Sequence, residues 1–416
     1  MTKEELQSVL KIPPRCIYVG KDEGWEVSDF LVDCSGYIGS INLDSLERLR
    51  CSIAFNQCKF IGEIVEKNKT YQYAFIFRRC SFQGFRFFDC AFKERINFDS
   101  CIFAQGVVFS DSRLNKKICF SNCRFEYEAM FVRTKFMEAS SFVRSIFENN
   151  AIFYGAQFNR LVSFNHAIFK SEVSFVNVAM DFDFGNLKNM VIEMATKEDI
   201  NEKIMTNDYR DSFRLIKNSL AKNGNTLDAS QYHKMELYCK EIELESKEQK
   251  SLSDWLEKWQ LWFYRKTSDH HTDLLRIVGW VMACIGLFGL VSFGYHHGGQ
   301  LIDSSEIDRY PVMHFLEGLW GAEVYRASSE SGFVLLAIGV SAVGLLSNFS
   351  RMILGVLLSL CVVISNPKNI FGVAKLFEGQ KISGAENVII FFYAFVMILL
   401  LFSLQKTARK NTITPN

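Results

Sequence analysis

Residues 80–125 read CSFQGFRFFDCAFKERINFDSCIFAQGVVFSDSRLNKKICFSNCRF, and a phenylalanine recurs in this stretch every five or six residues. Beyond Phe92 the steps alternate between six and five residues, which gives an eleven-residue period. The ladder holds 17 of the 39 phenylalanines of the chain. It comprises Phe82, Phe87, Phe92, Phe98, Phe103, Phe109, Leu114, Phe120, Phe125, Phe131, Phe136, Phe142, Phe147, Phe153, Phe158, Phe164, Phe169 and Phe175, and Met180 is a candidate further member. The fold must accommodate this repeat before anything else.

Neither a continuous helix nor a continuous strand can direct all ladder residues to one side. Five residues turn an α-helix by about 500°, so Phe98 and Phe103 would point about 140° apart. In a long strand, an odd spacing sends successive members to opposite faces. A chain that forms a short strand and turns a corner every five or six residues solves both problems, because each phenylalanine then points to a common axis. Four such sides give a coil of about 22 residues, and stacked coils lie about 4.8 Å apart.

The residues two positions before each ladder member support a solenoid of this kind. Within a short strand, residue i−2 lies on the same inward face as residue i. One series of these positions holds small residues, which leave room for the neighbouring phenylalanine: Cys80, Cys90, Cys101, Cys123, Thr134, Ser145, Ala156 and Ala167. The other series is Ile96, Val107, Ile118, Ala129, Ser140, Ala151, Val162 and Val173. We therefore expect both series, including the cysteines, to belong to the core.

This pattern resembles the pentapeptide-repeat family, in the variant with phenylalanine as the central residue. The resemblance covers roughly residues 75–180, and it implies a right-handed, four-sided β-helix. A degraded form of the pattern continues upstream, so the β-helix is expected over residues 34–185, after an N-terminal cap at 1–33. The segment Ile61–Gln72 breaks the rhythm and is expected to loop out.

The resemblance says little about function. A known soluble role in the pentapeptide-repeat family is mimicry of DNA in binding to gyrase, and that role needs a strongly acidic rod. Residues 80–180 instead hold 12 Lys and Arg against 9 Asp and Glu. A gyrase-directed DNA mimic is therefore the least favoured function, and no nucleic-acid partner is expected.

A helical connector is expected over residues 186–250, where the phenylalanine pattern has stopped. One helical face carries apolar residues at i, i+4, i+7 and i+11, which are Tyr209, Phe213, Ile216 and Leu220. The sequence Asn223-Gly224-Asn225 then marks a turn. The inward residues of a second helix are Ala229, Tyr232, Met235 and Cys239. Two antiparallel helices of this kind are similar to a single TPR hairpin, so we expect a rigid adaptor, with peptide binding as the alternative.

Residues 251–272 are expected to form an amphipathic helix in the membrane interface. Trp255, Trp259 and Trp262 share one helical face with Phe263, and Arg265 and Lys266 end the helix. A tryptophan-rich face that ends in basic residues suits the boundary between lipid and water. Ser251 and Asp254 are placed for a variant of the capping box. The alternative is an ordinary amphipathic helix packed on the solenoid or on the hairpin.

The C-terminal third, residues 273–405, is expected to be a transmembrane domain. Its long apolar runs predict about four spans, at 274–295, 332–347, 352–365 and 387–404. The two middle spans divide a 33-residue apolar run that would be about 50 Å long as one helix, against about 30 Å of hydrocarbon. Three spans or a re-entrant segment are the alternatives.

The resemblance to bacterial pentapeptide-repeat proteins implies a location in the inner (cytoplasmic) membrane, and the apolar runs predict a multi-pass protein. Arg265, Lys266 and the basic tail at 406–416 are expected on the cytoplasmic side. The first fifteen residues lack an apolar signal region, so the N-terminal domain is also expected in the cytoplasm.

Between the first two spans, the segment Pro311–Val324 is a candidate short helix that dips back toward the membrane. Proteins with this organisation are often called ion-channel-like. His314, Glu317 and Glu323 are therefore possible pore residues, with an ordinary loop as the alternative. The TxGYG-type filter of a potassium channel does not occur in the sequence, which argues against selective potassium conduction.

The sequence favours a non-enzymatic protein. It holds none of the phosphate loops, dinucleotide-binding glycine sets, metalloprotease motifs or nucleophile elbows that would indicate an enzyme. Its 12 cysteines include no CxxC pair, so we expect thiols and neither a metal nor another cofactor. The leading hypothesis is a membrane-anchored protein whose cytoplasmic solenoid binds a protein partner or a second copy. The alternative is an oligomeric channel or membrane-perturbing effector that the solenoid controls.

Overall fold

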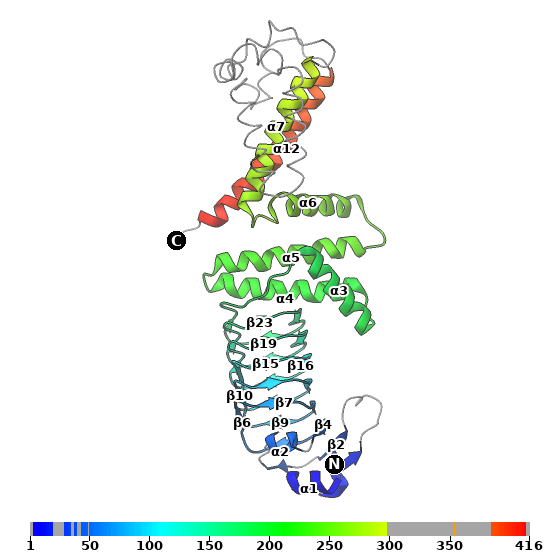
Figure 1. Ribbon diagram of the computed structural model, residues 1–416, viewed down its shortest axis with the longest axis vertical. Coiled ribbons are helices and arrows are strands. Elements are labelled where there is room, and N and C mark those ends of the chain that lie inside the picture. Colours follow the sequence, from blue (N-terminus) through cyan, green and yellow to red (C-terminus); the bar gives the residue numbers. More distant parts are fainter. Residues whose placement is uncertain are drawn as a thin grey trace, which may run out of the picture. The chain divides into compact units, whose positions relative to one another are not determined.

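The computed structural model describes residues 3–19, 29–34, 37–39, 43–48, 50–297, 353 and 384–412 (Figure 1). The chain divides into two compact units, Met1–Trp255 and Leu256–Asn416. Each unit is described by itself below.

The first unit is built around a β-solenoid of about six turns, and its short strands form four sheets. Sheet A comprises β1 (Ile17–Val19), β2 (Phe30–Asp33), β4 (Ile53–Asn56), β8 (Phe75–Arg78), β12 (Ile96–Asp99), β16 (Ile118–Ser121), β20 (Ser140–Ser141) and β24 (Val162–Ser163). Sheet B comprises β3 (Tyr37–Ile38), β5 (Lys59–Phe60), β9 (Ser81–Phe82), β13 (Ile102–Phe103), β17 (Arg124–Phe125), β21 (Ile146–Phe147) and β25 (Ile168–Phe169).

Sheets C and D complete the turns of the solenoid. Sheet C comprises β6 (Ile64–Lys67), β10 (Phe85–Phe88), β14 (Val107–Ser110), β18 (Ala129–Met130), β22 (Ala151–Ile152) and β26 (Val173–Ser174). Sheet D comprises β7 (Thr70–Tyr71), β11 (Ala91–Phe92), β15 (Arg113–Leu114), β19 (Lys135–Phe136) and β23 (Gln157–Phe158). Neighbouring strands pair in parallel, as Ile96 does with Ile118, whereas β1 runs antiparallel to β2. The expected β-solenoid is therefore confirmed.

Stacked phenylalanine rings fill the interior of the solenoid. Along sheet A, Phe98 lies 5.2 Å from Phe77 and 4.8 Å from Phe120, and the rings are within 8° of parallel. Phe98 also meets Phe103 of sheet B edge to face at 5.3 Å. Both geometries suit the quadrupole of an aromatic ring, and each pair adds about 0.5–1.5 kcal/mol beyond the burial of area. Every ladder residue is buried except Phe169, which is partly buried in the last turn.

The corners of the solenoid depend on residues in the left-handed backbone region. Non-glycine residues with φ between 50° and 58° recur at equivalent corners of successive turns, for example Ser100, Asn122 and Asp111. This conformation costs an ordinary L-residue roughly 1–2 kcal/mol. The N–H of each of these residues compensates by donating to a carbonyl of the next turn, as Ser100 does to Ser121 at 2.8 Å. The corners are therefore held by the stack and not by local propensity alone.

The expectation that Ile61–Gln72 loops out is wrong. This segment forms strands β6 and β7, and Ile64 pairs with Phe85 while Tyr71 pairs with Phe92. The ring of Tyr71 stacks on that of Phe92 at 4.9 Å, so it occupies a ladder position. The rhythm looked broken because Glu66 stands where Phe87 stands in the next turn. The backbone of this turn remains regular although its side chains do not.

The residues at i−2 lie inside, and several of them form hydrogen bonds with the neighbouring turn. The Cys101 thiol donates to the Phe77 carbonyl at 3.4 Å, and the Ser145 hydroxyl donates to the Phe120 carbonyl at 2.6 Å. The Thr134 hydroxyl donates to the Phe109 carbonyl in the same way. Where one of these positions carries a thiol or a hydroxyl, that group therefore adds a hydrogen bond between neighbouring turns.

Short helices close the N-terminal end of the solenoid. They are α1 (Lys3–Leu10), the 3₁₀ turn η1 (Pro14–Cys16) and α2 (Leu43–Glu47). Leu6 and Leu10 of α1 are buried in the same core as Leu43 and Leu46 of α2 and the phenylalanine ladder.

At the other end, α3 (Phe184–Glu198), α4 (Glu202–Lys222) and α5 (Thr226–Ser246) follow the last turn (Figure 1). The α4–α5 hairpin was expected, but its contact with the end of the solenoid was not. The Phe164 N–H donates to the Ser212 hydroxyl at 2.8 Å, and the Ser219 hydroxyl donates to the Val173 carbonyl at 2.6 Å. The Tyr232 hydroxyl donates to the Val178 carbonyl at 3.0 Å. The hairpin therefore satisfies polar backbone groups that the last turn would otherwise expose.

The second unit contains most of α6 (Leu252–Ser268), together with α7 (Leu274–His297) and α12 (Gly384–Thr412). Helices α7 and α12 lie side by side (Figure 1). Among the described residues, one helix rather than four is long and apolar enough to cross a membrane, at Asn387–Arg409. The apolar part found in α7, Leu274–Ile285, is shorter. The predicted spans 332–347 and 352–365 lie outside the described residues, apart from Ile353.

Candidate interaction and membrane surfaces

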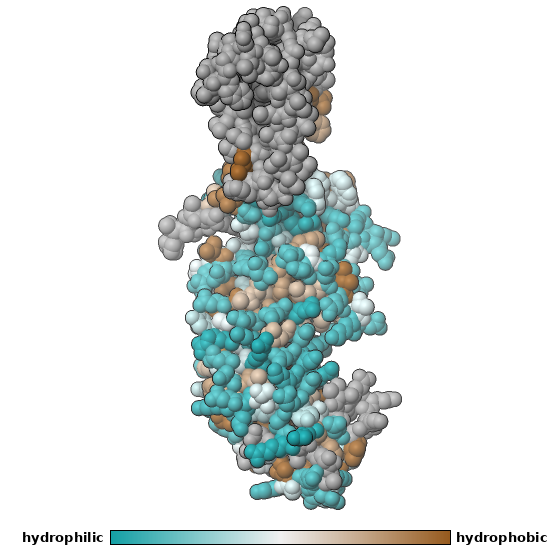
Figure 2. Space-filling view, in the orientation of Figure 1, coloured by the Kyte–Doolittle hydropathy of each residue, from teal (hydrophilic) through white to brown (hydrophobic). Residues whose placement is uncertain are grey.

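The solenoid has a filled interior, so any partner must meet its outer surface. Figure 2 shows that hydrophilic residues dominate the visible surface of the first unit, with smaller apolar areas among them. On many strands an outward residue alternates with a buried one, as Arg113 does with Leu114 and Lys135 with Phe136. The interior fixes the backbone, and the outward positions remain available for recognition.

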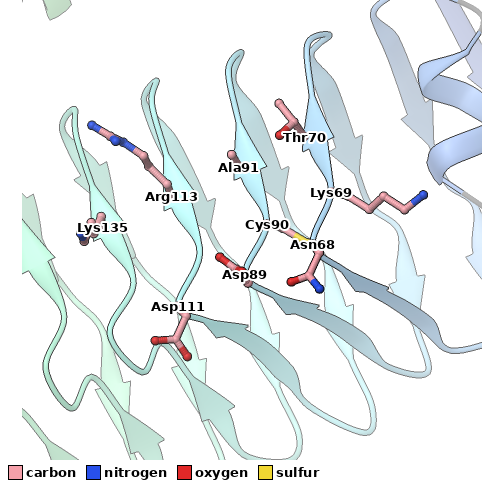
Figure 3. A pocket seen from close by; sticks show the side chains of 9 residues that line it. All are labelled: Asn68, Lys69, Thr70, Asp89, Cys90, Ala91, Asp111, Arg113 and Lys135. Carbon is pink, nitrogen blue, oxygen red and sulfur yellow. The ribbon is translucent and has the colours of Figure 1, made fainter.

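A shallow hollow of about 410 Å³ lies where sheet C turns into sheet D (Figure 3). Its lining residues are Asn68, Lys69, Thr70, Asp89, Cys90, Ala91, Asp111, Arg113 and Lys135. Asn68, Asp89 and Asp111 follow one another along the corner, and Ala91 lies on β11 between Thr70 and Arg113 of the adjacent strands. The hollow forms there because the methyl group of Ala91 is shorter than the side chains on either side.

Cations along sheet D dominate the charge of this hollow. Arg113 and Lys135 are register neighbours on adjacent parallel strands, an arrangement that is unfavourable for like charges. Arg133 binds both carboxylate oxygens of Asp111, at 2.5 and 2.7 Å, and these hydrogen bonds lower the pKa of Asp111. The Asp111 carboxylate is therefore already paired with Arg133. A carboxylate brought by a partner would relieve the repulsion between Arg113 and Lys135.

A second cavity, of about 360 Å³, runs between α3 and one corner of the solenoid. It is lined by Glu94, Arg95, Lys116, Lys117, Glu138, Ala139, Arg160, Leu161, Met190, Glu193, Met194 and Lys197. Ion pairs cross or flank it, since Lys117 lies 2.5 Å from Glu198 and Arg160 lies 3.2 Å from Glu193. These pairs hold α3 to the solenoid, and they neutralise much of the charge that a ligand would need.

The cysteines of the solenoid have little reactivity in this environment. Cys58, Cys80, Cys101 and Cys123 occupy equivalent buried positions in successive turns. Burial raises the pKa of the Cys101 thiol well above its usual range, and a hydrogen bond with the Cys123 thiol adds to the shift. A neutral buried thiol is a poor nucleophile and a poor metal ligand. In the part of the chain that the structure describes, no three His, Cys, Asp or Glu side chains form a metal-binding group.

The start of α6 has the predicted capping box. The Asp254 N–H donates to the Ser251 hydroxyl at 3.1 Å, and the Ser251 N–H donates to the Asp254 carboxylate at 2.8 Å. Lys247 lies 2.5 Å from the same carboxylate, and together these hydrogen bonds hold the pKa of Asp254 well below its usual range. The reciprocal bonds fix where α6 begins.

The tryptophans of α6 are exposed. Trp255, Trp259 and Trp262 have exposed fractions of 58%, 39% and 44%. Leu252 and Leu256 are exposed as well, whereas Phe263 stacks on Trp259 and packs against the α7–α12 core. A row of exposed tryptophan and leucine side chains with basic residues at its end matches the composition of interfacial helices.

Helices α7 and α12 share a narrow apolar contact and leave a broad apolar face uncovered. Ile277 and Leu400 are buried in the contact, and Phe288 stacks on Tyr393 with ring centroids 4.0 Å apart. The large apolar side chains exposed on α12 are Val388, Phe391, Phe392, Phe395, Ile398, Leu401 and Phe402. This face would be unfavourable in water.

A buried polar cluster joins the turn between α6 and α7 to α12. The Ser403 hydroxyl donates to the Ser268 hydroxyl at 3.0 Å, and the His271 Nδ1 lies 3.0 Å from the Ser403 hydroxyl. Asp269, His270 and His271 all have positive φ, between 50° and 68°. Sequence reasoning missed this junction, because its partners are more than 130 residues apart and neither side has a distinctive motif.

The possible pore residues His314, Glu317 and Glu323 lie outside the described residues. Of the basic tail, Lys406 and Arg409 are exposed at the C-terminal end of α12.

No family model matches this sequence, and the comparisons with curated proteins and with solved structures likewise found no match.

Proposed function

We propose that the protein is a membrane-attached, non-enzymatic scaffold whose cytoplasmic solenoid binds an acidic segment of a protein partner. In this proposal the solenoid has the right-handed, four-sided form of the pentapeptide-repeat family, and further spans accompany α7 and α12 in the inner membrane. The observation that carries the proposal is the exposed apolar face of α12, and the exposed tryptophans of α6 add to it.

The dimensions of α12 support membrane insertion. Its apolar stretch Asn387–Arg409 has 23 residues, and at 1.5 Å per residue it would be about 35 Å long. That length exceeds the roughly 30 Å of a bilayer core. An α-helix also satisfies its own backbone hydrogen bonds, which lipid cannot do.

The hollow on sheet D supports the assignment of a partner. Ala91, Arg113 and Lys135 lie in one row on three adjacent strands. A partner segment can approach the sheet at the small Ala91 with its carboxylates toward both cations. Pairs of this kind contribute more to specificity and association rate than to affinity.

Alkaline carbonate extraction of membranes that contain the full chain tests the attachment. We expect the protein to stay in the membrane pellet. A Phe392→Asp/Phe395→Asp variant should be released or degraded, whereas Ile102→Asp/Ile168→Asp, which alters exposed apolar residues of the solenoid, should stay in the pellet. Release of the unaltered chain into the soluble fraction would refute membrane attachment.

A photo-crosslinking residue at position 91 tests the partner surface. We expect a crosslinked protein that disappears in an Arg113→Glu/Lys135→Glu variant, while the same probe at position 81 on sheet B gives no such product. Equal products at both positions would refute a specific surface.

Planar-bilayer recording tests whether the membrane region only anchors the solenoid. We expect no unitary currents from the purified full chain. Reproducible unitary currents would replace the scaffold with the channel alternative.

A further inference from the structure

Building on the proposed membrane attachment, we infer that the junction of α6, α7 and α12 binds the phosphate groups of anionic phospholipids. The site lies where the buried polar cluster joins the end of α6 to the end of α12. It deepens the proposed function by naming the lipid class that the membrane unit recognises.

The polar cluster sets the geometry of the site. Ser403 contacts both Ser268 and His271 at 3.0 Å, and the His271 backbone N–H donates to the Ser268 hydroxyl at 3.1 Å. Ser268, His271 and Ser403 are all buried, as is Thr407 one turn further along α12. Two segments that are far apart in the sequence are thereby fixed against each other.

Basic side chains lie within about one helical turn of this contact on both helices. Arg265 precedes Ser268 by three residues, and Lys406 follows Ser403 by three, so each lies near the helical face that carries the contact. Lys266 and Arg409 are exposed beside them. Asp273 faces Arg276, at 3.2 Å, at the start of α7. The end of α6 and the end of α12 therefore each carry two cations within six residues of the contact.

The surface of α12 changes character at the same level. Leu401 and Phe402 are exposed just before Ser403, whereas Lys406 and Arg409 are exposed just after it. The boundary between apolar and charged surface therefore coincides with the polar cluster. In a membrane this boundary lies at the headgroups, where lipid phosphates are found.

The charge of the site favours anionic lipids over zwitterionic ones. Each basic residue near an anionic membrane surface contributes about 1 kcal/mol, and a basic pocket at the cytoplasmic end of transmembrane helices suits an anionic headgroup. The choline of phosphatidylcholine would bring its quaternary ammonium group toward Arg265, Lys266, Lys406 and Arg409, which are also cationic.

The test uses the full chain, purified in a neutral detergent and titrated with dioctanoyl-phosphatidylglycerol or dioctanoyl-phosphatidylcholine. Native mass spectrometry counts the bound lipids. We expect phosphatidylglycerol to bind at least about tenfold more tightly, because several cations act together. Replacing the four cations by glutamine (R265Q, K266Q, K406Q and R409Q) should reduce this preference to about twofold or less.

Two controls separate the site from general charge and from misfolding. The matched variant R79Q, K93Q, K116Q and R144Q removes four exposed cations from the solenoid and should leave the preference unchanged. An Arg265→Lys/Arg409→Lys variant keeps the charge and should keep most of the preference, with circular dichroism checking that each variant remains folded.

Equal affinity for the two lipids would overturn the inference, and so would an unchanged preference in the glutamine variant. Displacement of phosphatidylglycerol by equimolar inorganic phosphate would show a free-phosphate site, which would also overturn it. If carbonate extracts the unaltered chain, the proposed membrane attachment is refuted, and this inference is refuted with it. If the chain resists extraction but shows no headgroup preference, only this inference fails.

Discussion

Phenylalanine occupies opposite environments in the two units of this protein. In the solenoid, rings such as Phe98 and Phe120 stack at 4.8 Å in a buried column. On α12, Phe391 and Phe392 have exposed fractions of 67% and 61%. The same side chain therefore excludes water from inside one unit and forms the outer surface of the other. The difference teaches that composition alone does not separate a buried core from an exposed apolar surface, whereas spacing does.

The backbone hydrogen bonds of the two units also differ, because their partners are distant in the sequence in one unit and close in the other. In the solenoid, the strands and corners hydrogen-bond to a neighbouring turn, as Ser100 does to Ser121. In α7 and α12, the partners lie four residues away in the same helix. A solenoid turn consequently depends on its neighbours, whereas a membrane helix can form by itself.

The largest expected effect is the loss of a ring from the middle of the column. We expect Phe120→Ala to lower the free energy of unfolding of the solenoid by about 3–5 kcal/mol, because it removes contacts with both adjacent turns and leaves a cavity. Urea unfolding of the full chain in detergent, followed by circular dichroism, measures this. Phe395→Ala on α12 is the matched control. A similar loss of stability in both variants would contradict the difference between the buried rings of the solenoid and the exposed rings of α12.

The next effect concerns the α4–α5 hairpin, where Glu236 accepts hydrogen bonds from Arg214 at 2.9 Å and Lys217 at 2.8 Å. Burial alone would raise the pKa of Glu236, but hydrogen bonds with His233, Lys217 and Arg214 outweigh it and lower the pKa to about 2. Because the folded pKa lies below the unfolded value, the stabilisation is complete above about pH 4.5. It is lost as the pH falls toward 2.

We expect Glu236→Gln to lower the free energy of unfolding by of the order of 2 kcal/mol at pH 6, and by much less near pH 2.5. Urea titrations at the two pH values measure the difference between the variant and the unaltered chain. Glu126→Gln, at an exposed carboxylate on the solenoid, should show little effect at either pH. A deficit in Glu236→Gln that does not shrink at low pH would contradict the role of the carboxylate charge.

A smaller effect is expected inside the solenoid at Ser145. Its hydroxyl donates to the Phe120 carbonyl and accepts from the Cys123 N–H at 3.2 Å. We expect Ser145→Ala to lower the free energy of unfolding by about 1–2 kcal/mol, because both buried groups lose a partner. Ser145→Cys should restore more than half of the loss, since cysteines serve at the equivalent positions of earlier turns. Equal losses in the two variants would show that volume and not hydrogen bonding matters there.

The smallest effect on stability is expected at the tryptophans of α6. Replacing Trp255, Trp259 and Trp262 by serine should change the free energy of unfolding of the solenoid by less than about 0.5 kcal/mol, because exposed side chains contribute little. In proteoliposomes, the same variant should lose the share of tryptophan quenching by brominated lipids that α6 contributes, whereas Trp280 on α7 should remain quenched. Unaltered total quenching would contradict an interfacial α6.

The repeat made the solenoid predictable from sequence, since Phe98 and Phe103 exclude a helix and a long strand by geometry alone. The turn with Ile64 and Tyr71 was not recognised, because its register is imposed by the turns on either side and not by its own residues. The capping contact of Ser212 with Phe164 was equally invisible, since any exposed helix can carry a serine. Such pairings depend on tertiary proximity, which a single sequence does not encode locally.

The candidate surfaces were also predictable only where their residues recur at a regular spacing within one segment. The aromatic face of α6 could be predicted, because its tryptophans recur at helical spacing. The hollow over Ala91 could not be predicted, because it depends on which residues lie beside Ala91 in the adjacent turns. The contact of His271 with Ser403 joins two segments that share no repeat or motif.

The two ends of the solenoid have a consequence for its length. One end is closed by α1 and the antiparallel pairing of β1 with β2, and the other by the hairpin that contacts Phe164 and Val173. In the described residues, elements at both ends therefore pack against the terminal turns of the solenoid. The length of the solenoid is consequently determined by the number of turns that the sequence encodes. Duplication or deletion of about 22 codons would change the length of the solenoid by about 4.8 Å while leaving both closures intact, so its length can change in evolution without redesigning either terminus.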